Sequence, residues 1–372
     1  MRAFRPPPRA RATLLPLSPC RAAPLPQSPP RPHFPEGSRT YAARSFVRHT
    51  PKVGPGGKNV EMLYGGNVVI PCLQKAGKRD IQALYVRQDA SASGHIVYRV
   101  PTDEEEARTV IERAEAIASK AGISIQRAST AYLDTLSDKR PNQSLDPVDL
   151  NLKCPQIHRP KGLVLAVRPL DIERIRCLSA FIQRDEETNT TYHAAVGKQN
   201  NIEIEFVPKP TRKFPVWLAL DQVVDPQNLG AILRSAHFFG CDGVVMTEQD
   251  TAPLNPVVSK ASSGALEVMS HIHTTLSLSK FLRESAENGW HIYGTDIHAP
   301  AKRRVHLSTE RTAPLVCEPT ILVLGSEGAG MRAEVGKNCH DHLIIDGAEE
   351  SGGVDSLNVS VAAGILLHVL LG

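Results

Sequence analysis

Three short segments in the carboxyl-terminal half of the chain combine polar side chains with glycine, as a site for a ligand or a reaction requires. The first, DQVVDPQNLGAILR at residues 221–234, carries Asn228, Gly230 and Arg234 where an apolar strand gives way to a helix. Gly230 allows close backbone approach, and an arginine near a helix start suits a phosphate or a developing negative charge. Taken alone, this segment is better explained as a helix capped by Asn228 with Arg234 in solvent.

The second segment, ILVLGSEGAG at residues 321–330, is an apolar strand that runs into Gly325, Gly328 and Gly330, with Glu327 among them. Glycines let a ligand reach the backbone. The spacing is G-x-x-G-x-G rather than the dinucleotide pattern G-x-G-x-x-G, and no long helix follows at once. The alternative to a ligand loop is a tight turn.

The third segment, SLNVSVA at residues 356–362, opens an apolar helix with Ser356, Asn358 and Ser360. Ser356 is the expected N-cap. Asn358 then falls in the first turn, where its amide can face a ligand. The alternative is that these small polar residues only satisfy the end of the helix.

The elements around these segments alternate from residue 216 onward. Apolar patterns predict strands at 216–220, 243–247, 290–295, 320–325 and 342–345, and helices at 228–239, 257–264, 278–288, 331–338 and 356–371. Apolar strands joined by helices indicate a parallel sheet covered on both faces. Ligands of such sheets bind beyond the carboxyl ends of the strands, where all three segments lie.

The chain divides into four parts by composition and pattern. Residues 1–58 are expected to be a disordered mitochondrial transit peptide and linker, 59–207 a small mixed α/β domain with a helix at 102–120, 208–215 a linker, and 216–372 the parallel-sheet domain. The linker lies in VPKPTRKFP, which holds three prolines and three basic residues.

Charge is unevenly spread between these parts. Residues 1–50 hold nine arginines, no lysine and one acid, Glu36, for a net charge of +8, and the rest has 34 basic and 38 acidic residues, or −4. Nucleic-acid binding therefore cannot be argued from net charge and needs a local patch. The basic residues from which such a patch for RNA could be built are Lys75, Lys78 and Arg79, with Lys209, Arg212 and Lys213 in the linker; each could equally be a solvated surface charge.

The leader is rich in arginine, alanine, serine and proline, which is typical of an organellar transit peptide. Arg39-Thr40-Tyr41-Ala42 resembles a mitochondrial processing site. A disordered linker without an address is the alternative.

Other classes are disfavoured by the residues present. The seven cysteines are odd in number, widely spaced and without C-x-x-C, which disfavours a disulfide framework or a zinc knuckle. No apolar run reaches the roughly 18–20 residues of a membrane helix. The pairs His271/His273 and His340/His342 fit strand alternation better than a metal site, so no metal is predicted.

Together, N-x-G-x-x-x-R (Asn228, Gly230, Arg234), L-G-S-E-G (324–328) and S-L-N-V-S-V-A (356–362) resemble the three ordered motifs of the SpoU/TrmH branch of the SPOUT RNA methyltransferases. The resemblance implies a trefoil knot that holds S-adenosylmethionine, and a homodimer whose active site spans the subunits. The first domain is loosely similar to the L30e-like RNA-binding domain of many members, mainly at residues 64–86 and 158–167.

The family's functional positions transfer onto matching residues. The cofactor pocket would be lined by Leu324, Gly325, Gly328, Ile344 or Ile345, and Leu357. The catalytic face would be built by Asn228, Arg234, Glu327, Ser356 and Asn358. The chain departs from the family at residues 344–347, IIDG, where a proline is often found and where the following loop is longer here.

With the leader, the resemblance implies ribose 2′-O-methylation of a guanosine in mitochondrial large-subunit rRNA, in the matrix, in support of ribosome maturation. Arg234 would either stabilise the developing alkoxide or act as the base, and the former is favoured because a guanidinium stays protonated at neutral pH. The alternatives are a non-catalytic RNA-binding assembly factor and a nucleotide-dependent oxidoreductase, although the motif of the latter is missing.

Overall fold

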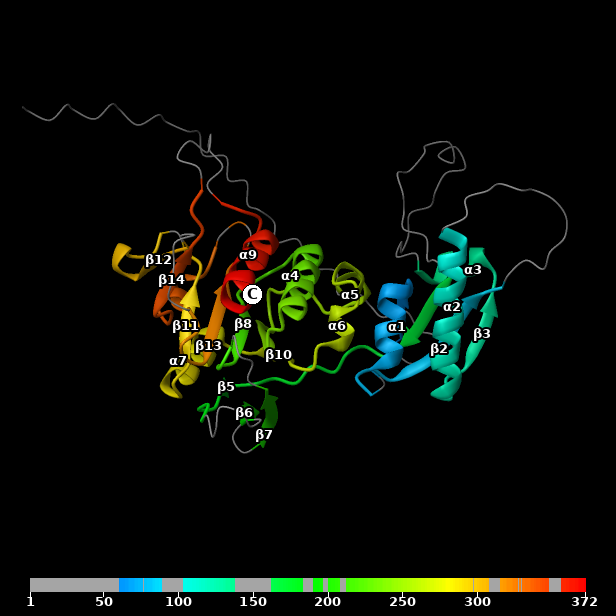
Figure 1. Ribbon diagram of the computed structural model, residues 1–372, viewed down its shortest axis with the longest axis horizontal. Coiled ribbons are helices and arrows are strands. Elements are labelled where there is room, and N and C mark those ends of the chain that lie inside the picture. The colour runs from blue at the N-terminus through cyan, green and yellow to red at the C-terminus, as the bar shows by residue number, and fades with distance from the viewer. Residues whose placement is uncertain are drawn as a thin grey trace, which may run out of the picture. The chain divides into compact units, whose positions relative to one another are not determined.

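The structure, a computed structural model, describes residues 60–75, 77–88, 103–137, 162–182, 190–196, 200–207, 212–296, 298–307, 315–326, 328, 330–347 and 356–372 (Figure 1). The predicted transit peptide and part of the predicted linker lie outside the described residues. Among the described helices, none combines the length and the apolar character needed to cross a membrane.

Seven strands of the described residues form a parallel sheet at the centre of the carboxyl-terminal region. The sequence predicts a parallel sheet and five of these strands. The strand order is β10-β9-β8-β13-β11-β14-β12, and every neighbouring pair is parallel. The strands are β8 (Val216–Leu220), β9 (Gly243–Thr247), β10 (Ile272–Thr275), β11 (His291–Gly294), β12 (Arg304–His306), β13 (Thr320–Leu324) and β14 (Asp341–Ile344). Strands β8, β9 and β13 are buried along their whole length, which is typical of strands covered on both faces.

The two faces of this sheet have separate hydrophobic cores because successive side chains of a strand point to opposite sides. Leu218 and Leu220 of β8 pack on one face with α4 (Pro226–Phe239) and α9 (Val359–Leu371). Trp217 and Ala219 pack on the other with α7 (Leu278–Glu287). The remaining helices are α5 (Pro256–Ala261), α6 (Ala265–Val268), the 3₁₀ helix η2 (Ala301–Arg303) and α8 (Ala333–Gly336).

Both helices of the motif segments begin at residues other than the predicted ones. Helix α4 begins at Pro226, and Asp225 is its N-cap. The Asp225 carboxylate accepts a hydrogen bond from Gln227 N at 3.0 Å. Proline suits the first position because that N–H has no helical partner. Helix α9 is capped by Asn358 rather than Ser356, since the Asn358 side chain accepts from Ser360 N at 2.9 Å.

The first region forms a four-stranded sheet of order β1-β4-β2-β3, in which β2 and β3 are parallel and the other pairs antiparallel. Its elements are β1 (Glu61–Tyr64), α1 (Gly66–Gln74), β2 (Ile81–Arg87), α2 (Asp103–Lys120), β3 (Ile125–Ala128), α3 (Thr130–Ser137) and β4 (Leu163–Val167). The mixed α/β character is as predicted, and the likeness to the L30e-like domain stays a prediction.

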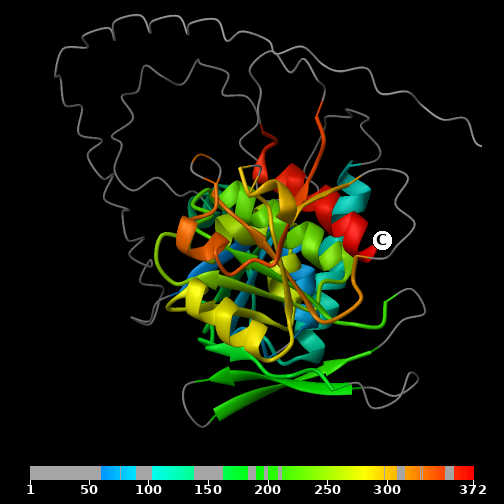
Figure 2. The same ribbon diagram turned by 90° about the vertical axis from the view of Figure 1, so that its left-hand side faces the viewer.

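A three-stranded antiparallel sheet joins the two regions: β5 (Cys177–Leu178), β6 (Thr190–Val196) and β7 (Asn200–Phe206). It precedes the predicted linker, yet its side chains share a core with Trp217, Phe281 and Trp290. Figure 2 shows these strands, in green, next to the yellow helix α7 that carries Phe281. The indole N–H of Trp217 donates to the Tyr192 hydroxyl at 2.7 Å. The hydrophobic cores therefore do not divide at residue 207, since β5–β7 pack with the parallel-sheet region.

Candidate functional site

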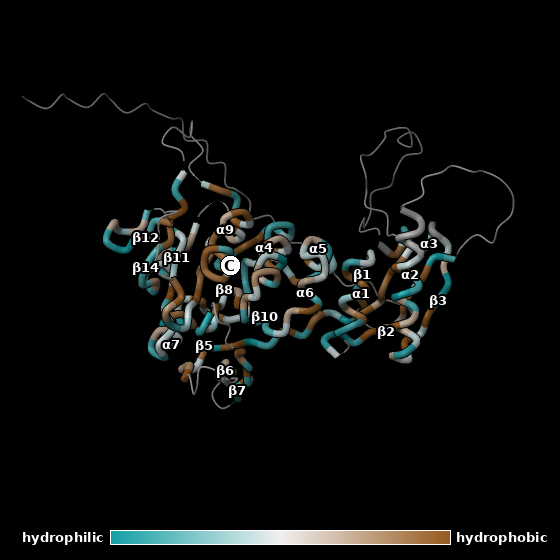
Figure 3. Tube along the Cα trace, viewed as in Figure 1, coloured by the Kyte–Doolittle hydropathy of each residue, from teal (hydrophilic) through white to brown (hydrophobic). Residues whose placement is uncertain are grey.

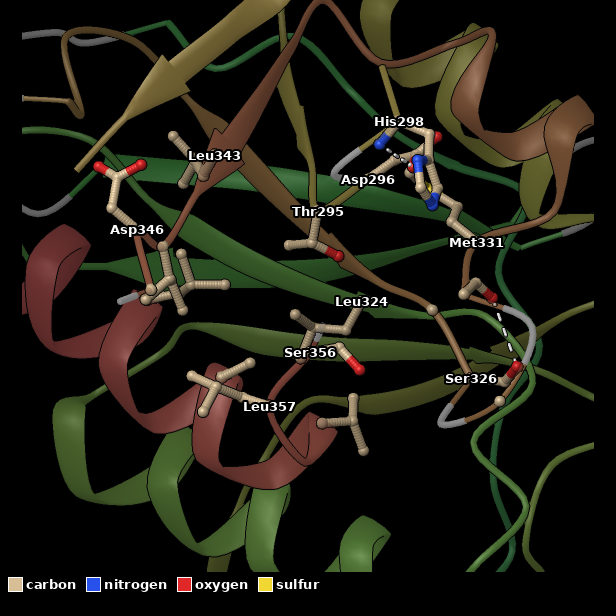
Figure 4. A pocket seen from close by; sticks show the side chains of 18 residues that line it. Thr295, Asp296, His298, Leu324, Ser326, Met331, Leu343, Asp346, Ser356 and Leu357 are labelled. Atoms are coloured by element: carbon tan, nitrogen blue, oxygen red, sulfur yellow. Dashed lines mark hydrogen bonds between the residues drawn. The ribbon is translucent and has the colours of Figure 1, made fainter. Parts of the chain in front are cut away.

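A cavity of about 600 Å³ opens at the carboxyl ends of β11, β13 and β14, next to the start of α9 (Figure 4). This is the edge at which parallel sheets bind ligands. The lining residues are Thr295, Asp296, His298, Leu324, Gly325, Ser326, Gly328, Gly330, Met331, Leu343, Ile345, Asp346, Gly347, Ser356, Leu357, Val359, Ala362 and Leu366.

The glycine bend after β13 forms one wall of the cavity. Ser326 N donates to Gly330 O at 3.0 Å and Gly330 N donates back to Ser326 O at 3.1 Å, which closes the bend. A Cβ atom on Gly325 would lie 2.3 Å from the backbone of Gly330 and Met331. Only glycine therefore fits at 325.

A buried ion pair fixes the far end of this bend. Asp221 directly follows β8 and is fully buried, and its carboxylate accepts from Arg332 N at 2.9 Å, Nε at 2.8 Å and Nη2 at 2.6 Å. The hydrogen bond to Asp221 is the main cause that raises the pKa of Arg332. The chain leaving the bend is thus attached to the strand that neighbours β13.

Two of the predicted catalytic residues meet beside the cavity. Asn358 Nδ2 donates to Asn228 Oδ1 at 3.1 Å, although the two residues are 130 positions apart. Asn358 Oδ1 accepts from Ser360 N at 2.9 Å and from Ser360 Oγ at 2.6 Å. The amide of Asn358 is therefore held in one orientation, and it links α4 to the first turn of α9.

The other predicted site residues divide into two groups. Leu324, Gly325, Gly328, Ile345, Ser356 and Leu357 line the cavity. Ile344 is buried and absent from the lining, Arg234 is exposed on α4 outside the lining, and Glu327 lies outside the described residues. Gly230 serves helix packing, since a Cβ there would lie 2.3 Å from Ala261 of α5.

Sequence reasoning missed several lining residues, including Thr295, Asp296, His298 and Asp346. Thr295 and Asp296 could have been predicted from the sequence. They end or directly follow the strand predicted at 290–295, and ligands bind at the carboxyl ends of such strands. Asp346 stands in the segment IIDG that departs from the family.

Three of the predicted RNA-contact residues form internal contacts instead. Arg79 is 5% exposed and pairs with Glu267 and Glu61, each at 2.7 Å. Arg212 is 8% exposed and pairs with Asp242. Lys78 donates to the carbonyls of Leu266 and Met269, and burial is the main cause that lowers its pKa to about 8.

The prediction that these three residues contact RNA is therefore wrong, because their charged groups already bind partners within the protein. Lys75 and Lys213 are exposed, and Lys209 lies outside the described residues.

The histidine pairs also have protein contacts. His340 Nδ1 accepts from Ile292 N at 2.9 Å, and His342 Nδ1 accepts from Asp296 N at 3.4 Å. Burial is the main cause that lowers the pKa of His340, His342, His271 and His273. Within the described part of the chain, no group of three or more His, Cys, Asp or Glu residues could hold a metal ion.

Comparison with known proteins decides the family. Residues 215–368 match the model of the SpoU rRNA Methylase family. The "rRNA methyltransferase 1, mitochondrial" of Schizosaccharomyces pombe is 35% identical over 243 residues, covering 64% of this chain and 77% of that protein. The chain belongs to the SpoU rRNA methylase family. This confirms the family predicted from the three motifs.

Further relatives and structures agree with this assignment. The protein of the same name from Dictyostelium discoideum is 34% identical over 252 residues, covering 68% of this chain and 43% of that protein. The chain spans less than half the length of the Dictyostelium and human relatives that it matches.

An rRNA methyltransferase from Sinorhizobium meliloti, crystallised with AdoMet, aligns over 84% of this chain and 86% of that chain at a TM-score of 0.52 and 19% identity. This confirms the SpoU/TrmH fold, while the knot stays a prediction.

Proposed function

We propose that this member of the SpoU rRNA methylase family transfers a methyl group from S-adenosylmethionine to a ribose 2′-hydroxyl of mitochondrial large-subunit rRNA, with a guanosine as the target. The observation that carries the proposal is the meeting of all three motifs: the second lines the cavity, the third opens over it, and the first is hydrogen-bonded to the third through Asn228 and Asn358. The names of the relatives support the substrate class.

The cavity suits this cofactor in size and chemistry. A volume of about 600 Å³ lies in the range of small-molecule sites. Leu343, Ile345 and Leu366 provide apolar walls for a base, and the bend at Gly325 offers backbone groups for polar contacts. When bound, S-adenosylmethionine supplies a methyl group already activated by the sulfonium charge.

The task left to the protein is to orient the ribose hydroxyl and favour loss of its proton. We assign Arg234 to the electrostatic role, in which its guanidinium holds a phosphate of the substrate and stabilises the developing alkoxide. The fixed Asn228–Asn358 pair keeps the first turn of α9 in place, so that Ser356 can position the substrate. Glu327 is proposed to orient Arg234.

The outer face of α9 supports a second copy of the chain as partner. Val361, Ile365 and Val369 recur every four residues along α9 and are 37–50% exposed, and Leu357, just before the helix, is 49% exposed. Helix α9 is thus hydrophobic nearly all round (Figure 3), which is typical of a helix buried on every side. In a homodimer through this face, the exposed Arg234 of one copy would complete the cavity of the other.

Methyl transfer to rRNA tests the catalytic proposal. The purified chain is incubated with mitochondrial large-subunit rRNA and labelled S-adenosylmethionine, and the methylated ribose is mapped. Arg234→Lys keeps the charge but loses the planar fork. We expect a large loss of turnover with cofactor binding retained. Near-normal turnover would contradict a role specific to the guanidinium, and cofactor binding without methylation by the unmodified chain would favour the assembly-factor alternative.

Oligomeric state tests the dimer. Val361→Asp is expected to convert the protein to monomers in sedimentation analysis. Ile182→Asp changes a side chain of similar type that is 71% exposed outside α9, and it should leave the oligomer unchanged. Mixing inactive Arg234→Ala with inactive Gly325→Val should restore activity if the site spans two copies, because one mixed site keeps both the arginine and the cavity. No restoration would place Arg234 and the cavity of one chain in the same site.

We also propose a mitochondrial matrix location. It is supported by the arginine-rich leader and by the names of the relatives. Import of the full chain into isolated mitochondria, with protection from added protease, is the expected result. Loss of import on deletion of residues 1–58 would assign the address to the leader.

A further inference from the structure

The charge of the cavity is one-sided. Its lining includes two carboxylates, Asp296 and Asp346, and no lysine or arginine among the described residues. Figure 4 shows the two carboxylates at separate ends, with Asp296 near Met331 and Asp346 beyond Leu343. Such a cavity favours a positively charged ligand over a neutral or negative one.

Asp296 is held in place from several sides. Its N–H donates to His342 Nδ1 at 3.4 Å, and its carboxylate accepts from His298 N at 2.8 Å. Thr295 donates from Oγ1 to Val323 O at 3.0 Å. A Cβ atom on Gly294 would lie 2.6 Å from the His342 ring, so glycine permits this close approach. The position of the carboxylate is therefore set by the end of β11 and its neighbours.

The two carboxylates differ in exposure and in the groups that contact them. Asp346 is about half exposed and pairs with His306 at 2.6 Å. The Asp296 side chain receives its hydrogen bond from a neutral backbone N–H, and within the described part of the chain no cationic side chain pairs with it. The Asp296 carboxylate also acts on the nearby His342 ring. Burial lowers the pKa of His342, and the negative charge of Asp296 partly opposes that shift.

We infer that Asp296 is the counter-ion of the sulfonium group and makes the cavity prefer S-adenosylmethionine over S-adenosylhomocysteine, an inference that rests on the proposed function. In the transfer, the ribose oxygen forms the new bond to the methyl carbon, the S–CH₃ bond breaks with its electron pair going to sulfur, and the ribose proton passes to solvent. The bound ligand thereby loses one positive charge. Asp296 then no longer attracts the sulfur, which favours release of the product.

Binding isotherms of the full chain test this inference with three ligands. S-adenosylmethionine carries the sulfonium, S-adenosylhomocysteine has a neutral thioether, and sinefungin has an ammonium group in place of the sulfonium. For Asp296→Asn, we expect the Kd of both charged ligands to rise about tenfold, or about 1.4 kcal/mol, while the Kd of S-adenosylhomocysteine changes less than about twofold. Asp346→Asn is the matched control and should leave the ratio of the Kd values unchanged, because that carboxylate is about half exposed to solvent and is already hydrogen-bonded to the His306 imidazole.

Other outcomes would overturn the inference. Equal losses for all three ligands would show that Asp296 is structural or binds the amino-acid end that they share. An equal effect of Asp346→Asn would show that the cavity acts through its total charge. If Asp296→Asn does not fold, salt dependence of the unmodified chain replaces it: added salt should weaken S-adenosylmethionine more than S-adenosylhomocysteine, and equal weakening would refute the counter-ion role. If the unmodified chain binds neither S-adenosylmethionine nor S-adenosylhomocysteine, the proposed function itself is refuted.

Discussion

Replacing Asp221 by asparagine should destabilise the protein and weaken the cofactor cavity together. The Asp221 side chain is completely buried, and three nitrogens of Arg332 lie within 2.9 Å of it. Asparagine keeps the size but loses the charge, and its amide group can accept at one atom only. Breaking a buried ion pair costs about 3–5 kcal/mol, and the 35% exposure of the Arg332 side chain places this one near the lower end, at about 3 kcal/mol.

Urea unfolding measures this loss, and calorimetry measures the accompanying fall in affinity for S-adenosylmethionine. Glu334→Gln is a matched control, because Glu334 contacts the same Arg332 at 3.1 Å but is 64% exposed. An exposed pair contributes about 0–1 kcal/mol, so the control should change stability by about 0.5 kcal/mol or less. The proposed role of the ion pair is refuted if Asp221→Asn is no more destabilising than Glu334→Gln. It is also refuted if the Asp221→Asn variant unfolds more easily while its folded form keeps the full affinity for S-adenosylmethionine.

Three further predictions follow from single sites. Gly325→Ala should abolish cofactor binding because its Cβ would strike backbone, whereas Gly328→Ala in the same bend meets no atom within 4 Å and should bind normally in the same titration. Burial lowers the pKa of His273 to about 4, so stability present above about pH 6.5 should be lost as the pH falls toward 4. His273→Leu should flatten that loss in urea unfolding at several pH values, and the exposed His193→Leu should not. Asn358→Ala should cost about 1 kcal/mol through the lost cap, while Asn358→Asp should keep the capping oxygen and the melting temperature but lose the amide donor and with it methyl transfer.

Local pattern predicts the elements that stand on long apolar runs. Strands 216–220 and 243–247 match the structure at both ends, because five successive buried residues bounded by turns leave little freedom in their limits. Strand β10, with the sequence IHTT, is predicted only through the strand-like alternation of His271 and His273, and its limits are not, because polar residues interrupt its apolar pattern. Helix α1 is harder to predict: residues 68–73 form only a short apolar segment, and Pro71 inside the helix is a strong signal against helix.

The features of the site that lie within a single segment of the sequence were predictable, and the contacts between distant segments were not. The bend at Gly325 is visible in the sequence because glycines cluster after an apolar strand. The ion pair between Asp221 and Arg332 joins residues that are 111 positions apart. The contact between His342 and Asp296 forms because β14 lies beside β11. Such contacts follow from strand order, which periodicity does not encode. The family motifs supplied part of that information for Asn228 and Asn358.

The position of β13 in the sheet has a consequence for folding during synthesis of the chain. This strand fills the gap between β8 and β11, although it is made after both, and it pairs with β8 across about a hundred positions. Until the ribosome has made residue 324, the new chain carries two apolar strands with open edges, which can pair with other molecules. Assembly of the sheet is therefore expected to be slow and to depend on holding factors that shield those edges until the last third of the chain arrives.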